Sequence, residues 1–415
     1  MGSFRYAVVG AGRQGAAAAY DMAVHGDAAD VLVLDANPER AADVAGRVSR
    51  LTGHPSVGSG ALDARDGEAL VKALEPIDVF LCATPFSLIL DCTRAAIASR
   101  TSMVDLGGHT ETVLAQWGMR EEVREAGISV VPDCGMGPGL NNTLGVYAIE
   151  QLLARRIRPF GVQLWDGGLP QEPTPPWGYS CSFHINGLTN EYDGQALVLR
   201  NGAVTKVDAL TEPETLTLDG HGEFEAFVTS GGTSTVPYTF EGILEFYENK
   251  TLRYPGHYRQ FKAFKDLGLF NEEPLTIAAG CSVSPRQLYH SLLGPQLENG
   301  RFKDICLMRA QGTGGVEGRR VSVIVELIDR YDEVTDFTAM ERLTGWHAAI
   351  MAQFIARGEV DAGVQPLETA ISATQFVDEV RRRGIAVTER WEESDSAGLY
   401  KQPMAVPDDG STRKG

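Results

Sequence analysis

Paired cysteines are missing from this sequence. Its six cysteines lie far apart and none forms a Cys-x-x-Cys motif, which argues against a structural zinc site. We expect the thiols to stay reduced in a cytoplasmic protein. Long apolar runs are also missing, because no stretch reaches the roughly 18 residues of a membrane-spanning helix. The first six residues show no signal-peptide pattern.

Positive charge is scarce. The chain has 37 Lys and Arg against 55 Asp and Glu, a formal net charge of −18. Such a chain repels phosphate backbones and anionic lipid, so we expect neither nucleic acid nor membrane as a partner. A cationic substrate is not disfavoured. With 415 residues, 43% of them hydrophobic and 22% charged, the sequence is typical of a globular protein with two or three domains.

A glycine-rich turn follows the first predicted strand, residues 5–9. The run Gly10-Ala11-Gly12-Arg13-Gln14-Gly15 separates this strand from a predicted helix over 16–24. In such a G-x-G-x-x-G motif the glycines permit the tight turn, the approach of a pyrophosphate and close helix packing, while the helix N-terminus supplies amide donors. The motif predicts a dinucleotide site. Its expected contacts are Gly10, Gly12, Arg13, Gln14 and Gly15.

Acidic and polar residues at the next strand ends extend this prediction. The strand over 31–34 ends in Asp35, where a carboxylate accepts hydrogen bonds from the adenosine ribose and repels the extra phosphate of NADP. We therefore predict NAD as the cofactor, although the nearby Arg40 opposes this preference. Asp63 is expected near the adenine. Thr84 and Pro85, after a strand over 78–83, are expected near the nicotinamide ribose.

Two further predicted strands, 102–106 and 128–131, end in glycine-rich turns that hold titratable residues. Because parallel strands end at one edge of a sheet, we expect His109 and Asp133 to share a crevice. His109 is the candidate general acid–base, since its ordinary pKa lies near working pH. Asp133 is the candidate for orienting that base or stabilising a cation. The alternatives are a loop histidine and an aspartate that only caps a turn or helix.

After about residue 142 the pattern changes to short strand-like segments with few helices. The fold class is therefore α/β, with an N-terminal doubly wound Rossmann sheet and an α+β catalytic domain built on a mostly antiparallel sheet. We expect Gly312–Gly315 to form a flexible hairpin tip. The predicted strands are Ser180–Ile185, Ala196–Arg200, Thr215–Thr217, Glu225–Thr229, Gly242–Tyr247, Ile305–Arg309 and Val321–Ile328.

Four segments follow from these patterns. The Rossmann domain is placed at 1–140 and the substrate-binding, catalytic domain at 141–340. C-terminal helices at 341–388 are expected to pack back on the Rossmann domain, chiefly through an apolar helix over 344–356. A polar tail, 389–415, is expected to be poorly ordered or draped on the surface.

Motifs in both halves resemble the saccharopine dehydrogenase-like superfamily and, within it, most closely the lysine 6-dehydrogenases. The resemblance rests on the segments Asp105–His109, Pro132–Asn141, Glu225–Thr235 and Lys250–His257. It implies a homo-oligomer, dimer or tetramer, that uses NAD to oxidise the ε-amine of L-lysine or a close diamino acid. The implied products are ammonia, NADH and 2-aminoadipate 6-semialdehyde, which closes to 1-piperideine-6-carboxylate.

An amino-acid substrate needs a cation for its carboxylate and hydrogen-bonding groups for its amine. Arg253 is the candidate carboxylate anchor, and strand alternation places it on the same face as Thr251. Thr233 and Ser234 offer hydroxyls and amides. Tyr179 is a weaker substrate-binding candidate, because aromatic residues on strands are usually core residues.

Two other functions stay open. A saccharopine or carboxynorspermidine-type dehydrogenase would act on a secondary amine and need a second cationic anchor, for which Arg200, Arg259 and Lys262 are available. A non-catalytic NAD(H)-binding regulator would keep the fold without the chemistry. The intact turns at Asp105–His109 and Pro132–Gly139 argue against the regulator.

Overall fold

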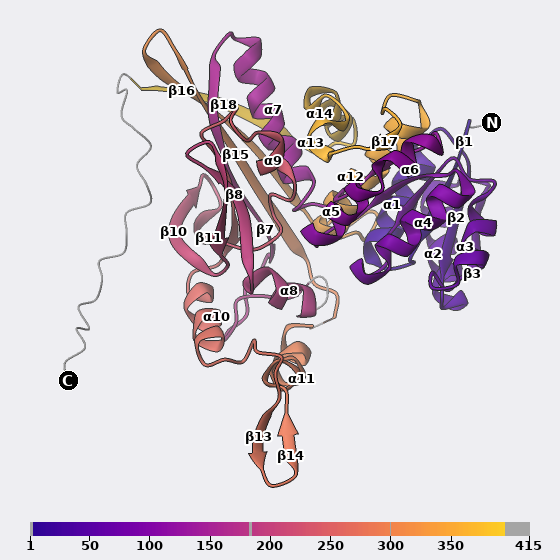
Figure 1. Ribbon diagram of the computed structural model, residues 1–415, viewed down its shortest axis with the longest axis horizontal. Coiled ribbons are helices and arrows are strands. Elements are labelled where there is room, and N and C mark those ends of the chain that lie inside the picture. Colours follow the sequence, from indigo (N-terminus) through magenta and orange to yellow (C-terminus); the bar gives the residue numbers. More distant parts are fainter. Residues whose placement is uncertain (1–2, 182–184, 299, 395–415) are drawn as a thin grey trace.

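The computed structural model describes residues 3–181, 185–298 and 300–394, which form two bodies side by side. Figure 1 shows the N-terminal body on the right, the second body on the left, and the last helices between them. No helix in these described ranges is long and apolar enough to cross a membrane. Within the described ranges, the six cysteines form no disulfide.

The N-terminal body is built on a seven-stranded sheet in the order β17-β6-β5-β4-β1-β2-β3, with every pair parallel. The predicted doubly wound sheet is confirmed, and its strand order reverses between β4 and β1. Its strands are β1 (Phe4–Val9), β2 (Ala28–Asp35), β3 (Val57–Ala61), β4 (Val79–Cys82), β5 (Ser102–Asp105), β6 (Ser129–Val131) and β17 (Gly363–Val364). Its helices are α1 (Arg13–His25), α2 (Pro38–Thr52), α3 (Gly67–Leu74), α4 (Ile89–Ser99), α5 (Thr110–Gly118) and α6 (Arg120–Glu125), with a short 3-10 helix η1 (Phe86–Leu88).

The second body is built on a nine-stranded sheet in the order β10-β11-β12-β7-β15-β16-β18, with β8 and β9 attached beside β12. Only the β7–β12 pair is parallel among the paired strands described, so the predicted mostly antiparallel sheet is confirmed. Its strands are β7 (Arg158–Pro170), β8 (Gln195–Arg200), β9 (Ala203–Asp208), β10 (Thr211–Leu218), β11 (Gly222–Val228), β12 (Phe246–Arg253), β15 (Asp304–Val316), β16 (Arg319–Arg330) and β18 (Val387–Ser394).

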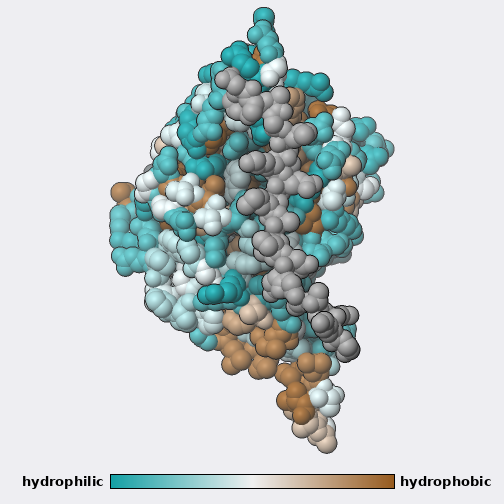
Figure 2. All heavy atoms as spheres, turned by 90° about the vertical axis from the view of Figure 1, so that its left-hand side faces the viewer, coloured by the Kyte–Doolittle hydropathy of each residue, from teal (hydrophilic) through white to brown (hydrophobic). Residues whose placement is uncertain are grey.

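Helices cover this sheet, and one small hairpin projects from it. The helices are α7 (Leu140–Ala154), α8 (Ile185–Tyr192), α9 (Val236–Thr239), α10 (His257–Asp266) and α11 (Pro285–Leu297). The hairpin pairs β13 (Leu275–Ala278) with β14 (Cys281–Val283) and extends away from the body (Figure 1). Ile277 on the hairpin and Leu292 on α11 are 66% and 62% exposed. Hydrophobic atoms gather at this end of the molecule (Figure 2).

Helix α12 (Ala339–Ala356) joins the two bodies. Its N-terminus has a capping box between Thr338 and Glu341, and most of its side chains are buried. At Gly345 it comes so close to α1 that a Cβ atom would lie 2.5 Å from the carbonyl oxygen of Gln14. Helix α12 thus packs on α1 of the first body. Downstream of it, β17 joins the Rossmann sheet, while α13 (Leu367–Ala370) and α14 (Ala373–Arg382) contact α7.

Four local predictions are wrong. Gly312–Gly315 is not a hairpin tip but part of β15, where Gly312 packs so closely on α7 that a Cβ would lie 2.9 Å from that of Ala148. The turn falls at Glu317 and Gly318, both with positive φ. The strand predicted over Gly242–Tyr247 begins only at Phe246.

The other two errors lie next to residues outside the described ranges. Residues 389–394 are not a loose tail, because they belong to β18, which pairs with β16 over its whole length. Trp391 in this strand lies under the Arg155 guanidinium at 3.5 Å, so the segment has packing partners. Ile185, predicted as the end of a strand, begins α8. The rest of that predicted strand at 182–184 and the tail from 395 lie outside the described residues.

Candidate functional site

The glycine turn after β1 has the shape of a diphosphate cradle. Gly10 has a φ of +112°, and a Cβ there would lie 2.5 Å from the carbonyl oxygen of Ala83. A Cβ on Gly15 would lie 2.1 Å from the carbonyl oxygen of Gly10. By contrast, a Cβ on Gly12 would meet nothing within 4 Å, and Gly12 begins α1 without a side-chain cap. Helix α1 thus begins beside open space at Gly12, and a helix N-terminus of this kind suits an anion.

Asp35 stands at the end of β2 beside this turn. Its two carboxylate oxygens accept hydrogen bonds from the amides of Ala11 and Asn37, each at 2.8 Å. A carboxylate can still accept further bonds from ribose hydroxyls, so this geometry suits the expected role. Arg40 is exposed two residues into the first turn of α2. Asp63 is bound instead by Arg65, and both side chains are largely exposed.

The residues expected near the nicotinamide lie at the ends of β4 and β5. Thr84 contacts the thiol of Cys82 at 3.1 Å, and Pro85 precedes η1. Phe86 then stacks on His109, with ring centroids 4.6 Å apart and planes 12° apart. The structure thus brings Thr84, Pro85 and His109 to the same edge of the sheet.

His109 caps the N-terminus of α5. Its Nδ1 lies 2.9 Å from the hydroxyl of Thr112, and the ring is half-buried. Nε2 has no hydrogen-bond partner among the described residues, so one ring nitrogen remains available at the strand edge. The sequence did not predict this helix-capping role, which uses Nδ1 and leaves Nε2 for chemistry.

Asp133 lies at the centre of the site. Its Oδ1 accepts a hydrogen bond from the amide of Gly108 at 3.1 Å, and its Oδ2 accepts one from the hydroxyl of Ser234. Gly107 packs against it so closely that a Cβ would lie 1.6 Å from Oδ1. Burial, together with the charge of Asp105, raises the pKa of Asp133 to about 7. A buried carboxylate with that pKa exchanges protons near neutral pH.

Asp105 holds the two turns around Asp133 in place through hydrogen bonds. It is not among the site residues predicted from the sequence. It accepts hydrogen bonds from the amides of Gly107 and Asp133 and from the side chain of Gln116, at 2.9, 3.1 and 2.9 Å. Burial raises its pKa as well. Because it holds both strand-end turns, Asp105 fixes the position of Asp133 relative to Gly108.

The loop after β11 connects the two bodies at this point. The carbonyl oxygen of Gly232 accepts hydrogen bonds from the side-chain amides of Asn141 and Asn142 at 3.0 and 3.1 Å. The hydroxyl of Ser234, predicted to bind the substrate, donates a hydrogen bond to Asp133. Thr233 does not face the site, because its hydroxyl donates to the carbonyl oxygen of Leu197.

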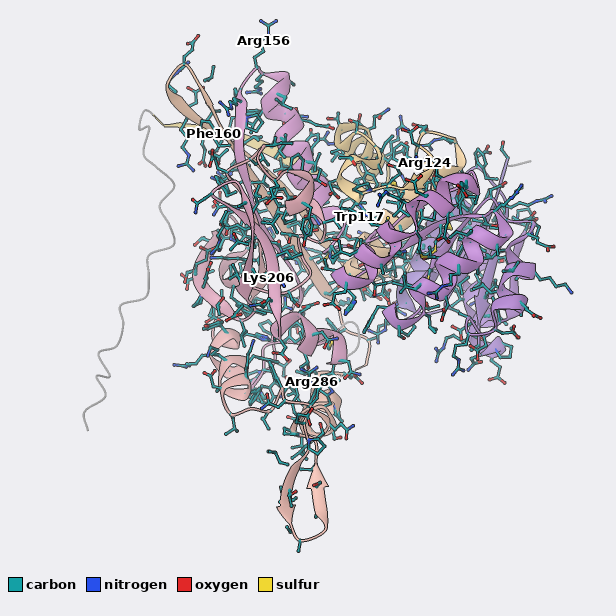
Figure 3. The ribbon with its side chains drawn as sticks, viewed as in Figure 1. Trp117, Arg124, Arg156, Phe160, Lys206 and Arg286 are labelled. Atoms are coloured by element: carbon teal, nitrogen blue, oxygen red, sulfur yellow. The ribbon has the colours of Figure 1, made fainter. Side chains whose placement is uncertain are left out.

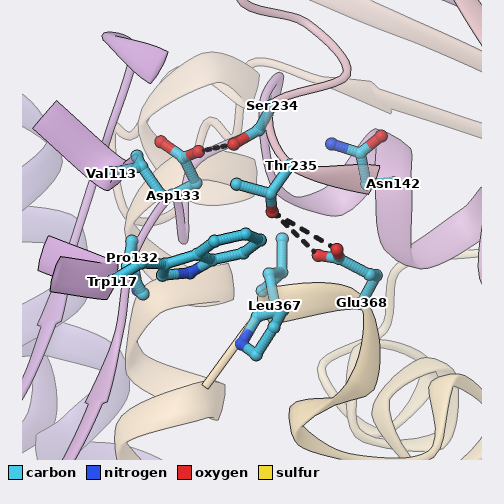
Figure 4. A pocket seen from close by; sticks show the side chains of 10 residues that line it. Val113, Trp117, Pro132, Asp133, Asn142, Ser234, Thr235, Leu367 and Glu368 are labelled. Carbon is cyan, nitrogen blue, oxygen red and sulfur yellow. Dashed lines mark hydrogen bonds between the residues drawn. The ribbon is translucent and has the colours of Figure 1, made fainter. Parts of the chain in front are cut away.

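A narrow pocket lies next to Asp133 at the junction of the bodies (Figure 4). Trp117, which Figure 3 places at this junction, forms one wall. Glu368 forms another and accepts a hydrogen bond from Thr235 at 3.3 Å. Burial raises the pKa of Glu368. No sequence motif predicts Glu368 as a site residue. It lies at the pocket only because the C-terminal segment folds back against the junction of the two bodies.

Arg253 lies deeper in the second body and is 3% exposed. It donates from Nε to the hydroxyl of Tyr192 at 2.7 Å and pairs with Glu191 at 3.5 Å. Tyr179 packs its ring 4.8 Å from the guanidinium carbon and edge-on to His257. Arg253 is therefore not a surface ion-pair residue. The structure brings it together with Tyr179.

The glycine turn, the parallel sheet and the helix N-terminus together define a dinucleotide-binding domain. A model of the saccharopine dehydrogenase NADP binding domain matches residues 6–131, and a model of the saccharopine dehydrogenase C-terminal domain matches residues 135–385. The chain belongs to the saccharopine dehydrogenase family.

Individual relatives are distant. Saccharopine dehydrogenase (NADP⁺, L-glutamate-forming) of Saccharomyces cerevisiae is 23% identical over 217 residues, 51% of this chain and 48% of the relative. This match thus spans about half of the relative's length. Carboxynorspermidine synthase of Vibrio cholerae is 23% identical over 281 residues, 64% of this chain and 65% of that protein.

One solved structure shares the whole architecture. The apo saccharopine dehydrogenase (L-Glu forming) from Saccharomyces cerevisiae superposes with a TM-score of 0.75 at 17% identity, covering 94% of this chain and 100% of that one. At this identity the likeness establishes the fold.

Proposed function

We propose that this protein uses NAD to oxidise the ε-amine of L-lysine, or of a close diamino acid. The products are 2-aminoadipate 6-semialdehyde, which closes to 1-piperideine-6-carboxylate, ammonia and NADH. The observation that carries the proposal is Asp133, a buried carboxylate with a pKa of about 7 at the end of β6. Amine oxidation needs such a group, because the substrate ammonium must lose a proton before a hydride can leave its carbon.

The protein's own groups account for the proton steps. Asp133 in its ionised form takes the proton from the substrate ammonium, while Gly108 and Ser234 hold its two oxygens in place. Bound nicotinamide supplies the acceptor for the hydride from the ε-carbon. The resulting iminium is attacked by water, whose proton passes to Nε2 of His109, and collapse of the carbinolamine releases ammonia.

A secondary-amine substrate is the second candidate function. The relatives named for saccharopine and carboxynorspermidine favour it. The described residues offer little to a second substrate carboxylate, because Arg200 is paired with Glu212 and Glu248, and Lys262 with Asp266. Arg259 is exposed on α10. We therefore favour the primary amine. The ordered proton-handling groups also favour an enzyme over a binding regulator.

Product analysis separates these functions. The protein is incubated with NAD and either L-lysine or saccharopine, and ammonia, glutamate and the cyclic imine are quantified. Equal amounts of NADH, ammonia and cyclic imine from lysine alone support the proposal. Glutamate from saccharopine, with no product from lysine, would move the protein to the secondary-amine function.

The proposal also covers the oligomeric state and the cellular location of the enzyme. We propose a homo-oligomer, dimer or tetramer, in the cytoplasm, as the family resemblance implies. The exposed apolar side chains at the β13–β14 end support an association of chains. Light scattering coupled to size exclusion measures the mass directly, and a monomer at micromolar concentration would contradict this part of the proposal.

A further inference from the structure

Three buried acids lie at the junction of the two bodies without a cation beside them. Asp105, Asp133 and Glu368 are 0%, 3% and 5% exposed. Among the described residues, no lysine, arginine or histidine forms an ion pair with any of the three. Acids are rarely this buried without a cation, and neighbouring carboxylates in such surroundings do not all ionise together. The three acids are therefore expected to hold at least one proton near neutral pH.

Asp133 and Glu368 line the same narrow pocket (Figure 4). Asp133 comes from the turn after β6, and Glu368 from the first turn of α13. Two consecutive residues of the loop after β11 bind them: Ser234 donates its hydroxyl to Asp133, and the hydroxyl of Thr235 lies 3.3 Å from both oxygens of Glu368. A single short segment thus connects the two carboxylates.

The polar groups around Glu368 are uncharged. Thr239 of α9 donates a second hydroxyl hydrogen bond to it. Tyr247 approaches from β12, and burial together with the charge of Glu368 raises the pKa of that phenol. Trp117 of α5 and Asn142 of α7 add an indole and an amide to the pocket wall. Within the described ranges, only the other acids act on Glu368 through a negative charge, and none of these neighbours offsets its own.

The two carboxylates of the pocket oppose each other's ionisation. Burial raises the pKa of Asp133 and that of Glu368. After burial and the charge of Asp105, the charge of Glu368 raises the pKa of Asp133 further. Like charges repel strongly where water is excluded, so an ionised carboxylate holds the proton on its neighbour.

We propose that Asp133 and Glu368 form a proton-sharing pair in which Glu368 controls when Asp133 is ionised. Glu368 is then a positioning residue that acts through Asp133. While Glu368 holds its proton, Asp133 can ionise and take the proton of the substrate ammonium; while Glu368 is ionised, Asp133 keeps its own. The role in turnover rests on the proposed function, whereas the pairing is a property of the protein without substrate.

Infrared pH titration measures the pairing without turnover. A protonated carboxyl has a carbonyl stretch that disappears on ionisation, and the band missing in Asp133→Asn identifies Asp133. Glu368→Gln keeps an acceptor oxygen and removes the charge. The midpoint of the Asp133 band is therefore expected to fall by at least about half a pH unit, or about threefold in proton affinity. Glu368→Asp keeps the charge and should stay closer to the wild-type midpoint than Glu368→Gln.

Glu248→Gln is the matched control. Glu248 is 4% exposed and pairs with Arg200. It follows Tyr247 on β12, so it lies on the opposite face of the sheet from the Tyr247 hydroxyl, which reaches Asn142 at the pocket. This variant is expected to leave the midpoint of the Asp133 band unchanged.

An unchanged or higher Asp133 midpoint in folded Glu368→Gln overturns the pair. If that variant does not fold, Asp133→Asn decides, because coupling is reciprocal and must lower the midpoint of the Glu368 band, which its shift in Glu368→Asp identifies. An unchanged Glu368 midpoint there also overturns the pair. Failure of the proposed function has a different signature: the Asp133 midpoint falls in Glu368→Gln, yet lysine yields no NADH.

Discussion

Burial and the neighbouring carboxylate of Asp105 both raise the pKa of Asp133. Its pKa of about 7 predicts that the rate at saturating substrate rises with pH through that value, because only the ionised form accepts the proton. Asp133→Asn is expected to lower kcat by about 10²- to 10⁴-fold and to remove this rise. The measurement is kcat between pH 5.5 and 9, with bound NADH fluorescence as evidence that the cradle is intact.

Asp91→Asn is the control for that variant, because Asp91 is an exposed residue of α4 that pairs only with Arg94 among the described side chains. Its pH profile should match wild type. An unchanged kcat in Asp133→Asn would remove Asp133 from the proton step.

A substitution at Gly107 tests whether the position of the Asp133 carboxylate matters, because it leaves the charge of that group unchanged. The φ of Gly107 is +62°, and a Cβ would lie 1.6 Å from Oδ1 of Asp133, so Gly107→Ala must displace that carboxylate. We expect kcat to fall at least about tenfold while NADH still binds. Gly53→Ala is the matched control, since Gly53 has a φ of +68° with nothing within 4 Å of a Cβ. The control should cost only about 1 kcal/mol of stability, and equal kinetics in both variants would contradict the account.

Asp35 tests the cofactor choice. We expect Asp35→Ala to lower the ratio of kcat/KM for NAD to that for NADP by about tenfold or more, because the repulsion of a ribose phosphate is lost. Arg40→Ala should change the ratio in the opposite direction. If the ratio does not change in Asp35→Ala, this carboxylate does not contact the adenosine ribose. That result would favour NADP, the cofactor named in the family model.

Residues in local motifs were predictable from the sequence, and residues positioned by tertiary contacts were not. The glycine turn, Asp35, His109 and Asp133 follow strands directly, so pattern and strand order indicate their location. Glu368 stands in no chemical motif. Its unusual environment arises from burial by segments distant in the chain, which a single sequence does not show.

At the scale of elements, α12 couples the dinucleotide cradle to the second body. Gly345→Ala would place a Cβ 2.5 Å from the Gln14 carbonyl and 2.8 Å from the Ala18 amide, both in α1. We expect about 1–3 kcal/mol of destabilisation from overpacking and weaker NADH binding, since α1 carries the cradle. Thermal unfolding and fluorescence titration measure the two effects.

Thr344→Ala, one residue earlier, removes a methyl group and a hydroxyl that contacts the sulfur of Met340. It should leave NADH affinity unchanged. If Gly345→Ala binds NADH as tightly as this control, the contact between α12 and α1 does not position the cradle.

Glycine clusters show why some elements escaped prediction. Gly312–Gly315 has the composition of a turn, yet in β15 glycine is needed because α7 and β7 come too close for side chains. Likewise, the charged residues of β18 led to the prediction of a polar tail. In the structure they alternate with Val387 and Trp391 along an edge strand. Whether each of these two segments forms a strand depends on the elements that pack against it, and not on its own sequence pattern.

At the scale of the whole molecule, buried acids dominate the pH dependence of stability and are opposed in part by His257 and His347, whose pKa values burial lowers. Burial raises the pKa of Asp133 to about 7 and those of Asp166 and Asp304 to about 6, from 3.8. A raised pKa means that the folded chain holds the proton more tightly, so this stabilisation is complete below about pH 4 and is lost as pH rises to about 7. The net charge of −18 acts in the same direction.

We therefore expect the urea midpoint to be higher at pH 5 than at pH 8, with a difference of about 2–5 kcal/mol in unfolding free energy. Below about pH 4 the trend should reverse, because Glu212, whose pKa is lowered by Arg200, then loses its charge. Asp304→Asn should flatten part of the slope between pH 4 and 6. A midpoint that rises from pH 5 to pH 8 would contradict this picture.

The origin of the hydride is the central claim, and deuterium labelling tests it directly. The protein is incubated with NAD and L-lysine deuterated at both hydrogens of the ε-carbon, and the reduced cofactor and cyclic imine are analysed by mass spectrometry. The account predicts one deuterium on each NADH and one on the cyclic imine, with ammonia released in equal amount. NADH without deuterium, or no NADH from lysine, would contradict it.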